Sequence, residues 1–282
     1  MTKAVSKLVQ RSALLTGGAL ITTAALLVAE PAAAIRIDFD ESNVVTGPGE
    51  IITDQWAADY GLTVSATDKG GKNSRNLLLF NSSCDPVAND GSTDDLTLCT
   101  GGDRDLATGV GSYRNNNWDI DYDTPDQGNV LIIQEGGDLL NPDDHAGGGW
   151  INFDFAEALT FQSIGFLDLD DAGLPDFLFT FADGSTQLFK DMEDSDPEVT
   201  IVGQSSQTRG SNTIYNAENS LREYSFYLDN VVKASVKLPS SGAIAYLDVD
   251  YNQVEVPEPM AMAGLGVIAG SLLAARRRRN LG

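Results

Sequence analysis

Short hydrophobic or alternating segments, separated by Gly, Asn, Asp and Pro, run through most of this chain. Residues 77–80 and 130–133 are unbroken apolar runs, which predict strands buried on both faces. In 151–155, Ile and Phe alternate with Asn and Asp, which predicts a strand with one dry and one wet face. The other expected strands occupy 35–39, 177–181, 186–189, 224–228, 231–238 and 244–251. This pattern predicts an all-β sandwich.

Turn residues add detail to this prediction. Asp183-Gly184 lies between two of the expected strands, and Asp-Gly in that position is a strong signal for a hairpin. The segment 84–126 is polar and rich in turn residues, so we expect a long loop there. No linker or break in composition divides 35–255, which predicts one domain.

The N-terminal segment has the three parts of a secretory signal. Basic residues come first, an apolar stretch follows over 12–29, and small residues end it. This order predicts a signal-peptide helix over 1–34, with cleavage after Ala34 and with Ala32 as the other small site residue.

The C-terminal segment 256–282 carries a second signal. A stretch without charge, 260–275, can enter a bilayer. As a helix of about 24 Å it is slightly shorter than the hydrocarbon core of about 30 Å, and arginine snorkelling or local thinning would cover the gap. Arginines after this stretch would hold the chain end on the cytoplasmic side. The residues that define the tail are Pro257, Glu258, Pro259, Arg276, Arg277, Arg278 and Arg279. A plain C-terminal anchor is the alternative interpretation of the same residues.

This tail resembles the PEP-CTERM sorting signal of exported bacterial proteins. The resemblance implies an exosortase-type protease as partner and a precursor that is held in the membrane through the tail. Further segments are similar to cyanobacterial-type PEP-CTERM proteins of uncharacterised function; they are 52–56, 128–135, 141–144, 147–155, 163–171 and 241–244. That similarity implies a jelly-roll-like sandwich placed at the cell surface or in the extracellular matrix, in association with exopolysaccharide.

Charge narrows the range of partners. The chain has 18 basic and 41 acidic residues, and the two end segments contain 7 and 2 of these. The segment 35–255 therefore keeps 11 basic and 39 acidic residues, a net charge of −28. Such a charge makes nucleic acids and anionic lipid surfaces poor partners, and it leaves divalent cations and neutral glycans.

Cys84 and Cys99 are the only cysteines, and both lie in the segment expected outside the cell. An even pair in an oxidising compartment predicts a disulfide. It would close a loop of about 15 residues and stabilise the fold by roughly 3 kcal/mol.

Acidic and aromatic residues supply two candidate binding sites. Asp168, Asp170 and Asp171 follow an expected strand, and carboxylates on one face suit a structural calcium ion. A solvated acidic loop explains the same residues. Trp118 lies in a polar segment and is the candidate for an exposed ring that stacks on a sugar.

Catalysis has less support in the sequence. His145 is the only histidine, so a Ser-His-Asp arrangement would depend on it entirely, and no nucleophile elbow is present. We therefore expect a non-enzymatic surface or matrix protein. The alternative is a glycan-acting hydrolase or lyase that uses paired carboxylates.

Overall fold

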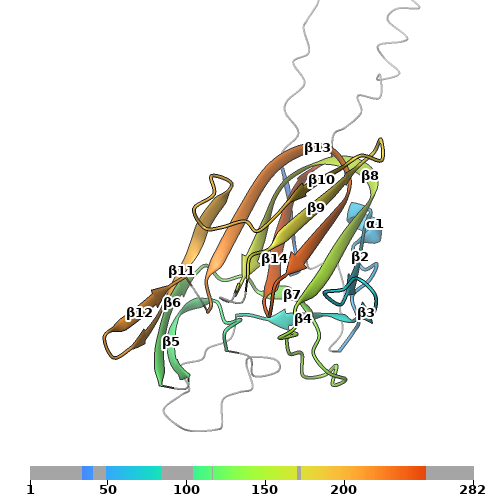
Figure 1. The fold of residues 1–282 in the computed structure, drawn as a ribbon. Helices are drawn as coiled ribbons and strands as arrows, with labels where there is room; N and C mark the ends of the chain where they lie inside the picture. The colour runs from blue at the N-terminus through green and yellow to red at the C-terminus, as the bar shows by residue number, and fades with distance from the viewer. Residues whose placement is uncertain are drawn as a thin grey trace, which may run out of the picture. The chain divides into compact units, whose positions relative to one another are not determined.

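The computed structural model describes residues 34–40, 49–83, 104–115, 117–169, 173–216 and 218–251, which form an all-β architecture with one short helix, α1 (Ala57–Tyr60) (Figure 1). The strands are β1 (Ile35–Asp38), β2 (Leu62–Thr67), β3 (Ser74–Arg75), β4 (Leu77–Asn81), β5 (Gly109–Asn115), β6 (Trp118–Thr124), β7 (Asn129–Ile133), β8 (Gly149–Leu167), β9 (Asp176–Phe181), β10 (Thr186–Phe189), β11 (Val199–Arg209), β12 (Asn212–Tyr215), β13 (Leu221–Leu238) and β14 (Ala243–Asp250). Within the described residues, no helix is long and apolar enough to cross a membrane.

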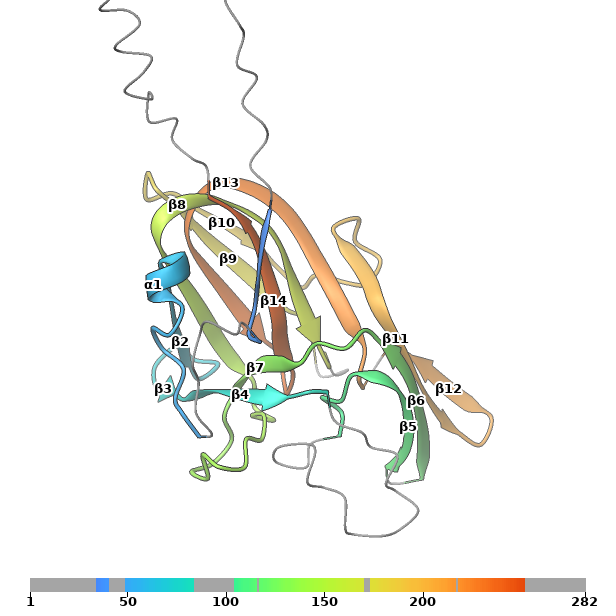
Figure 2. The same ribbon diagram turned by 180° about the vertical axis from the view of Figure 1, so that it is seen from behind.

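The two longest strands, β8 and β13, organise a large antiparallel sheet that folds back on itself (Figures 1 and 2). The first half of β8 pairs with β2 and with the second half of β13, which in turn pairs with β9. The second half of β8 pairs with β14 and with the first half of β13, and β11 continues from there. Each long strand therefore takes part in both layers, which fits the predicted sandwich.

The bend in β13 lies where its pairing with β8 shifts register, between Ser225 and Lys233. Tyr227 and Asn230 have φ angles of 52° and 61°, a left-handed conformation that interrupts the regular strand. Tyr227, Asp229 and Asn230 are exposed here, whereas Val231 is buried again where the strand resumes.

A hydrophobic core lies between the layers. Phe153 and Phe179 come from one layer and Phe161 from the other, and all three are fully buried. Phe226 packs among them at the bend, with its ring centroid 4.9 Å from that of Phe179. The alternation expected over 151–155 is confirmed, since the Ile and Phe side chains are buried and those of Asn and Asp are partly exposed.

A second hydrophobic core packs on the other side of the β4–β7–β14 part of the sheet. In β4, Leu77 belongs to the first core whereas Leu78 and Phe80 belong to the second. In β7, Leu131 belongs to the first core and Ile132 to the second. The prediction that these two apolar runs are buried on both faces is therefore confirmed.

The predicted hairpin at Asp183-Gly184 is also confirmed. β9 and β10 pair antiparallel, and the turn between them is closed by the Phe181 N–H, which donates to the Ser185 carbonyl at 2.9 Å. Gly184 has a φ of 83°, which its lack of a side chain makes easy to adopt.

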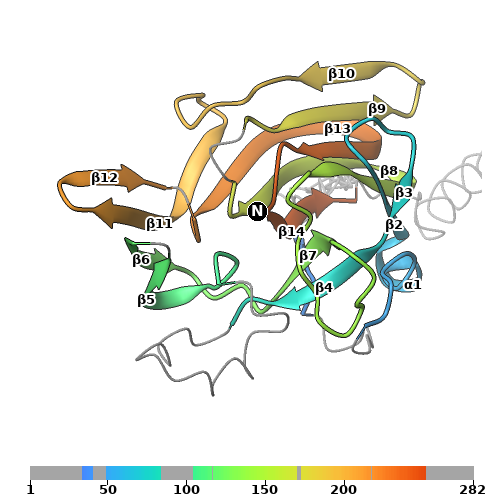
Figure 3. The same ribbon diagram turned by 60° about the horizontal axis from the view of Figure 1, so that its bottom comes forward.

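The expectation of a long loop over 84–126 is wrong for its second half, which forms the β5–β6 hairpin. Asp119 and Asp121 point to solvent on β6, whereas Ile120 and Tyr122 are buried in the second core. Three aspartates separate the apolar side chains of this strand, so its alternation was hidden by acidic residues. β11 and β12 extend the same part of the sheet beside β6 and were not predicted either (Figure 3).

The first and last strands of the body lie side by side. β1 pairs antiparallel with β14, with Ile35 opposite Val249 and Asp38 opposite Tyr246 (Figure 2). The described part of the body therefore begins and ends at the same place.

Candidate functional site

The acidic segment that was expected to bind calcium begins at a buried position. β8 ends at Leu167, and Asp168 follows with a φ of 58°, so the alternation of the strand does not continue through Asp168. The Asp168 side chain is fully buried, and its Oδ1 accepts the backbone N–H of Asn219 at 3.3 Å. Asp170 and Asp171 lie outside the described residues.

Asn219 connects this position to the β5–β6 hairpin. Its side-chain oxygen accepts the Tyr113 hydroxyl at 3.0 Å, and its side-chain nitrogen donates to the carbonyls of Arg104 and Ala107. Burial and the nearby Glu218 carboxylate raise the pKa of Tyr113, which keeps its hydroxyl protonated. Asp168 is thus part of a buried polar network that joins three parts of the fold.

Two other acidic residues of the body, Asp176 and Asp248, are paired with cationic side chains. Asp176 forms an ion pair with Lys237, with 2.7 Å between Oδ2 and Nζ. Asp248 accepts two hydrogen bonds from Arg36, at 2.8 and 2.7 Å. No group of three or more His, Cys, Asp or Glu side chains in the described residues is arranged to hold a metal ion.

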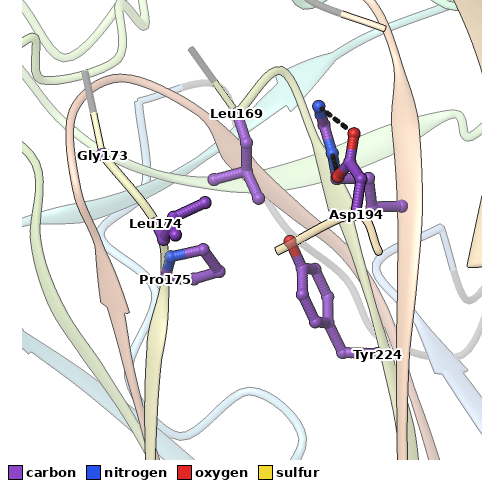
Figure 4. A pocket seen from close by; sticks show the side chains of 7 residues that line it. Leu169, Gly173, Leu174, Pro175, Asp194 and Tyr224 are labelled. Carbon is purple, nitrogen blue, oxygen red and sulfur yellow. Dashed lines mark hydrogen bonds and ion pairs between the residues drawn. The ribbon is translucent and has the colours of Figure 1, made fainter. Parts of the chain in front are cut away.

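Next to this network lies a hollow of about 320 Å³, at the end of β8 and the start of β13 (Figure 4). We call it the Tyr224 hollow. Its residues are Leu169, Gly173, Leu174, Pro175, Asp194, Arg222 and Tyr224. One wall is apolar and comes from the segment that leads into β9, and the other carries an arginine, a carboxylate and a phenol.

Arg222 and Asp194 form the charged part of the Tyr224 hollow. Nε and Nη2 of Arg222 donate to the two carboxylate oxygens of Asp194 at 2.6 and 3.2 Å. Nη1 donates to the Ser220 hydroxyl at 2.7 Å, and Nη2 also donates to the Asn216 carbonyl. The Arg222 side chain is 9% exposed and that of Asp194 43%, so the pair runs from the interior to the surface.

Tyr224 lies two residues further along β13 and is 1% exposed. Its ring packs against Phe166 and Phe177, with centroid distances of 5.3 and 4.9 Å. Its hydroxyl points into the hollow (Figure 4). Burial raises the pKa of this hydroxyl, which therefore remains neutral and able to donate.

A second hollow, of about 310 Å³, lies at the other side of the β14 layer, and we call it the acidic hollow. It is lined by Arg36, Asp38, Asp40, Ser83, Asp126, Gln127, Gly128 and Tyr246. The Ser83 hydroxyl and the Gly128 N–H donate to Asp126 and lower its pKa. Arg36 lies over the Tyr246 ring at 3.7 Å, so this aromatic face is already covered.

Trp118 is placed differently from the expectation. It is the first residue of β6 and is partly buried against the second core, whereas we expected an exposed ring in a loop. The Arg209 guanidinium lies 6.0 Å from its ring centre. Trp118 lines neither hollow.

His145 lies in the segment between β7 and β8, with its Nδ1 3.9 Å from a Glu135 carboxylate oxygen. Neither hollow includes it. The predicted disulfide partners Cys84 and Cys99, the cleavage-site residue Ala32 and the sorting residues of the tail lie outside the described residues. Ala34 is described, and it is exposed directly before β1.

No protein-family model matches this chain, and no curated protein matches it either. The site must therefore be judged from its own chemistry.

Sequence reasoning missed the Tyr224 hollow. Arg222 and Tyr224 share one face of β13, but Asp194 and the apolar wall reach them only through the folding of β9, β10 and β11. The one available signal was an arginine among the apolar positions of a strand, because a buried arginine requires partners.

Proposed function

We propose that this is an exported, non-enzymatic protein of the cell surface or extracellular matrix that associates with exopolysaccharide. A signal helix over 1–34 would deliver it. An exosortase-type protease would process the tail 256–282, whose apolar helix first holds the precursor in the membrane. The observation that carries the proposal is the presence of both end signals on one chain.

The placement of the first and last strands supports these boundaries. β1 begins at Ile35, directly after the predicted cleavage position, and it pairs with the last strand, β14. Removal of 1–34 and 256–282 would therefore leave this pairing intact. The antiparallel layers and their shared long strands support a jelly-roll-like sandwich as the exported domain.

Charge and site chemistry favour a neutral glycan as the partner. With a net charge of −28, the segment 35–255 repels polyanions. The Tyr224 hollow combines an apolar wall with hydrogen-bonding groups, which is the combination that a sugar ring requires. Calcium, bound with the help of Asp170 and Asp171, would add stability outside the cell.

Cell fractionation tests the proposal. We expect the processed protein, without 1–34 and with its tail cleaved, in the surface and matrix fractions of its own host. A membrane-bound precursor should accumulate when Arg276–Arg279 are all changed to Ala. The matched control changes Lys69 and Lys72, two exposed lysines of the body, to Ala and should leave the distribution unaltered. Intact protein in the cytoplasm would contradict the proposal.

The acidic hollow supports a second candidate, a glycan-acting enzyme. Asp38, Asp40 and Asp126 all line it, and paired carboxylates are the groups that glycoside hydrolysis uses. If this candidate is correct, purified protein degrades polysaccharide, and Asp126→Asn abolishes turnover. The control is Asp183→Asn, which lies on an exposed turn outside the hollow and should leave turnover unchanged. Absence of turnover would remove it.

A further inference from the structure

The Tyr224 hydroxyl is a buried polar group that the fold does not use. The side chain is 1% exposed, and its ring contacts fix its position between Phe166 and Phe177. No hydrogen bond joins its hydroxyl to any residue that the structure describes. The hydroxyl is not among the polar atoms shut off from solvent, so it is open to the Tyr224 hollow. Buried hydroxyls are ordinarily hydrogen-bonded, because leaving them unpaired is costly. A hydroxyl that points into a hollow without a protein partner indicates a ligand or water as its partner.

Arg222 and Asp194 provide further polar contacts in the same hollow. Four N–H groups of Arg222 are used by Asp194, Ser220 and Asn216, and the fifth, on Nη1, has no acceptor among the described residues. Asp194 is the exposed member of the pair and can accept hydrogen bonds from outside. The hollow thus offers a donor from Arg222, an acceptor from Asp194 and the Tyr224 hydroxyl, which can act as either.

We propose that the Tyr224 hollow binds a single pyranose ring of a neutral glycan. This inference deepens the function proposed above and rests on it. The ring hydroxyls would pair with Tyr224, Arg222 and Asp194, and the C–H face would lie on Leu174 and Pro175. The volume of about 320 Å³ is at the lower end for small-molecule sites, which suits one ring and not an extended chain.

The electrostatics favour a neutral sugar over an acidic one. The charge of Arg222 is already matched by Asp194 at hydrogen-bond distance, so a carboxylate or sulfate would find no unpaired cation in the hollow. The net charge of −28 on the segment 35–255 would also repel an anion. A neutral sugar carries only uncharged hydroxyls, so it needs no unpaired cation and is not repelled by the net charge.

The test is saturation-transfer NMR on the full chain with methyl glycosides of glucose, galactose and mannose as probes. The protein is kept in a detergent without a sugar headgroup, so that the detergent cannot occupy the hollow. We expect transfer to at least one glycoside. Tyr224→Phe should weaken its binding about fivefold, which is the usual effect of losing one neutral hydrogen bond. The matched control is Tyr215→Phe, because Tyr215 is 73% exposed on β12 and should leave affinity unchanged.

Thermal melting separates a binding role from a structural one. Because the Tyr224 hydroxyl makes no hydrogen bond to a described residue, Tyr224→Phe should leave Tm unchanged or raise it. A fall in Tm with unchanged glycoside binding would overturn the inference. Absence of transfer to all three glycosides would overturn it as well.

Retention on the host's own exopolysaccharide keeps this inference distinct from the proposed function. Retention of the full chain that falls with Tyr224→Phe supports both. If the variant is retained as well as the parent, the hollow is not the glycan site and the proposed function stands. If neither protein is retained, the exopolysaccharide association fails and the inference fails with it.

Discussion

At the scale of single residues, two buried charges of the described body lie beside an opposite charge. Arg222 is paired with Asp194, and Lys237 is paired with Asp176, whose side chain is only 5% exposed. A buried pair contributes little over an apolar pair of the same shape, but removal of one partner leaves a charge without compensation. Such residues are therefore sensitive to substitution although they take no part in a hydrophobic core.

Lys237→Met tests this argument. It leaves the Asp176 carboxylate buried without its cation, and we expect a loss of about 3 kcal/mol in the free energy of unfolding. The control is Lys69→Met, which removes an exposed lysine that has no ion pair with a described residue and should not change the unfolding transition. Urea denaturation of both variants measures the difference, and equal stabilities would contradict the argument.

The same pair sets a pH dependence. Burial tends to raise the pKa of Asp176, but the Lys237 ammonium, the Asp191 N–H and the Lys190 charge lower it more, so the pKa is below its usual value. The stability from Asp176 is then complete above about pH 4 and is lost as the pH falls through the lowered value. Asp176→Asn should flatten the acid side of a plot of Tm against pH. An unchanged acid slope would show that other carboxylates cause it.

At the scale of the elements, two glycines allow tyrosine rings to lie across neighbouring strands. Gly165 on β8 is paired with Tyr246 on β14, and a Cβ at Gly165 would lie 2.5 Å from that ring. Gly111 on β5 and Tyr122 on β6 repeat the arrangement. Glycine inside a strand is unfavourable by itself, and here the ring of the neighbouring strand fills the space.

Gly165→Ala should therefore destabilise the fold by about 2 kcal/mol, because the Tyr246 ring must move out of a packed position. Gly137→Ala is the matched control, since nothing lies within 4 Å of a Cβ there. Calorimetric melting compares the two. A Gly165→Ala protein as stable as the control would mean that the ring relocates freely.

Much of the strand content could be predicted from the sequence because it depends on local patterns. The two apolar runs and the alternation over 151–155 each record the burial of their own side chains. β6 was missed because three aspartates on its solvent face outweigh Ile120 and Tyr122. The segments expected as two strands, 224–228 and 231–238, form the one strand β13, because the bend at Tyr227 and Asn230 keeps its pairing with β8 on both sides.

The candidate site was predicted less well, because it depends on contacts between residues that are far apart in the sequence. The Asp168 segment was correctly placed after a strand, but its burial depends on Asn219, which is far away in the sequence. The Tyr224 hollow requires three separate loops and strand ends to meet, and no local pattern records that meeting.

At the scale of the whole molecule, the excess of negative charge acts on stability. Repulsion among 39 acidic residues opposes the compact state, and dissolved ions reduce it. A salt effect of this kind is independent of the type of cation at equal ionic strength. A bound calcium ion would add stability beyond it.

Melting of the full chain in sodium chloride and in calcium chloride of matched ionic strength separates the two effects. We expect Tm to rise with sodium chloride through screening. A further rise of several degrees with calcium, reversed by chelator and absent in an Asp170→Asn, Asp171→Asn variant, would support the calcium expectation. If Tm rises equally in both salts, the acidic segment is a solvated surface and not a calcium site.

The pairing of β1 with β14 has a mechanical consequence. Ile35 and Val249 mark the end at which the chain leaves the sheet, whereas Leu167 and Ala243 mark the other end, beside the Tyr224 hollow. These ends are separated by the length of β14, about 26 Å. If the tail of the precursor is still held in a membrane while a glycan is bound in the hollow, tension would run along the strands. This tension would act on all the hydrogen bonds between β14, β8 and β13 at the same time. Strands loaded in this way resist pulling better than strands whose hydrogen bonds break one after another.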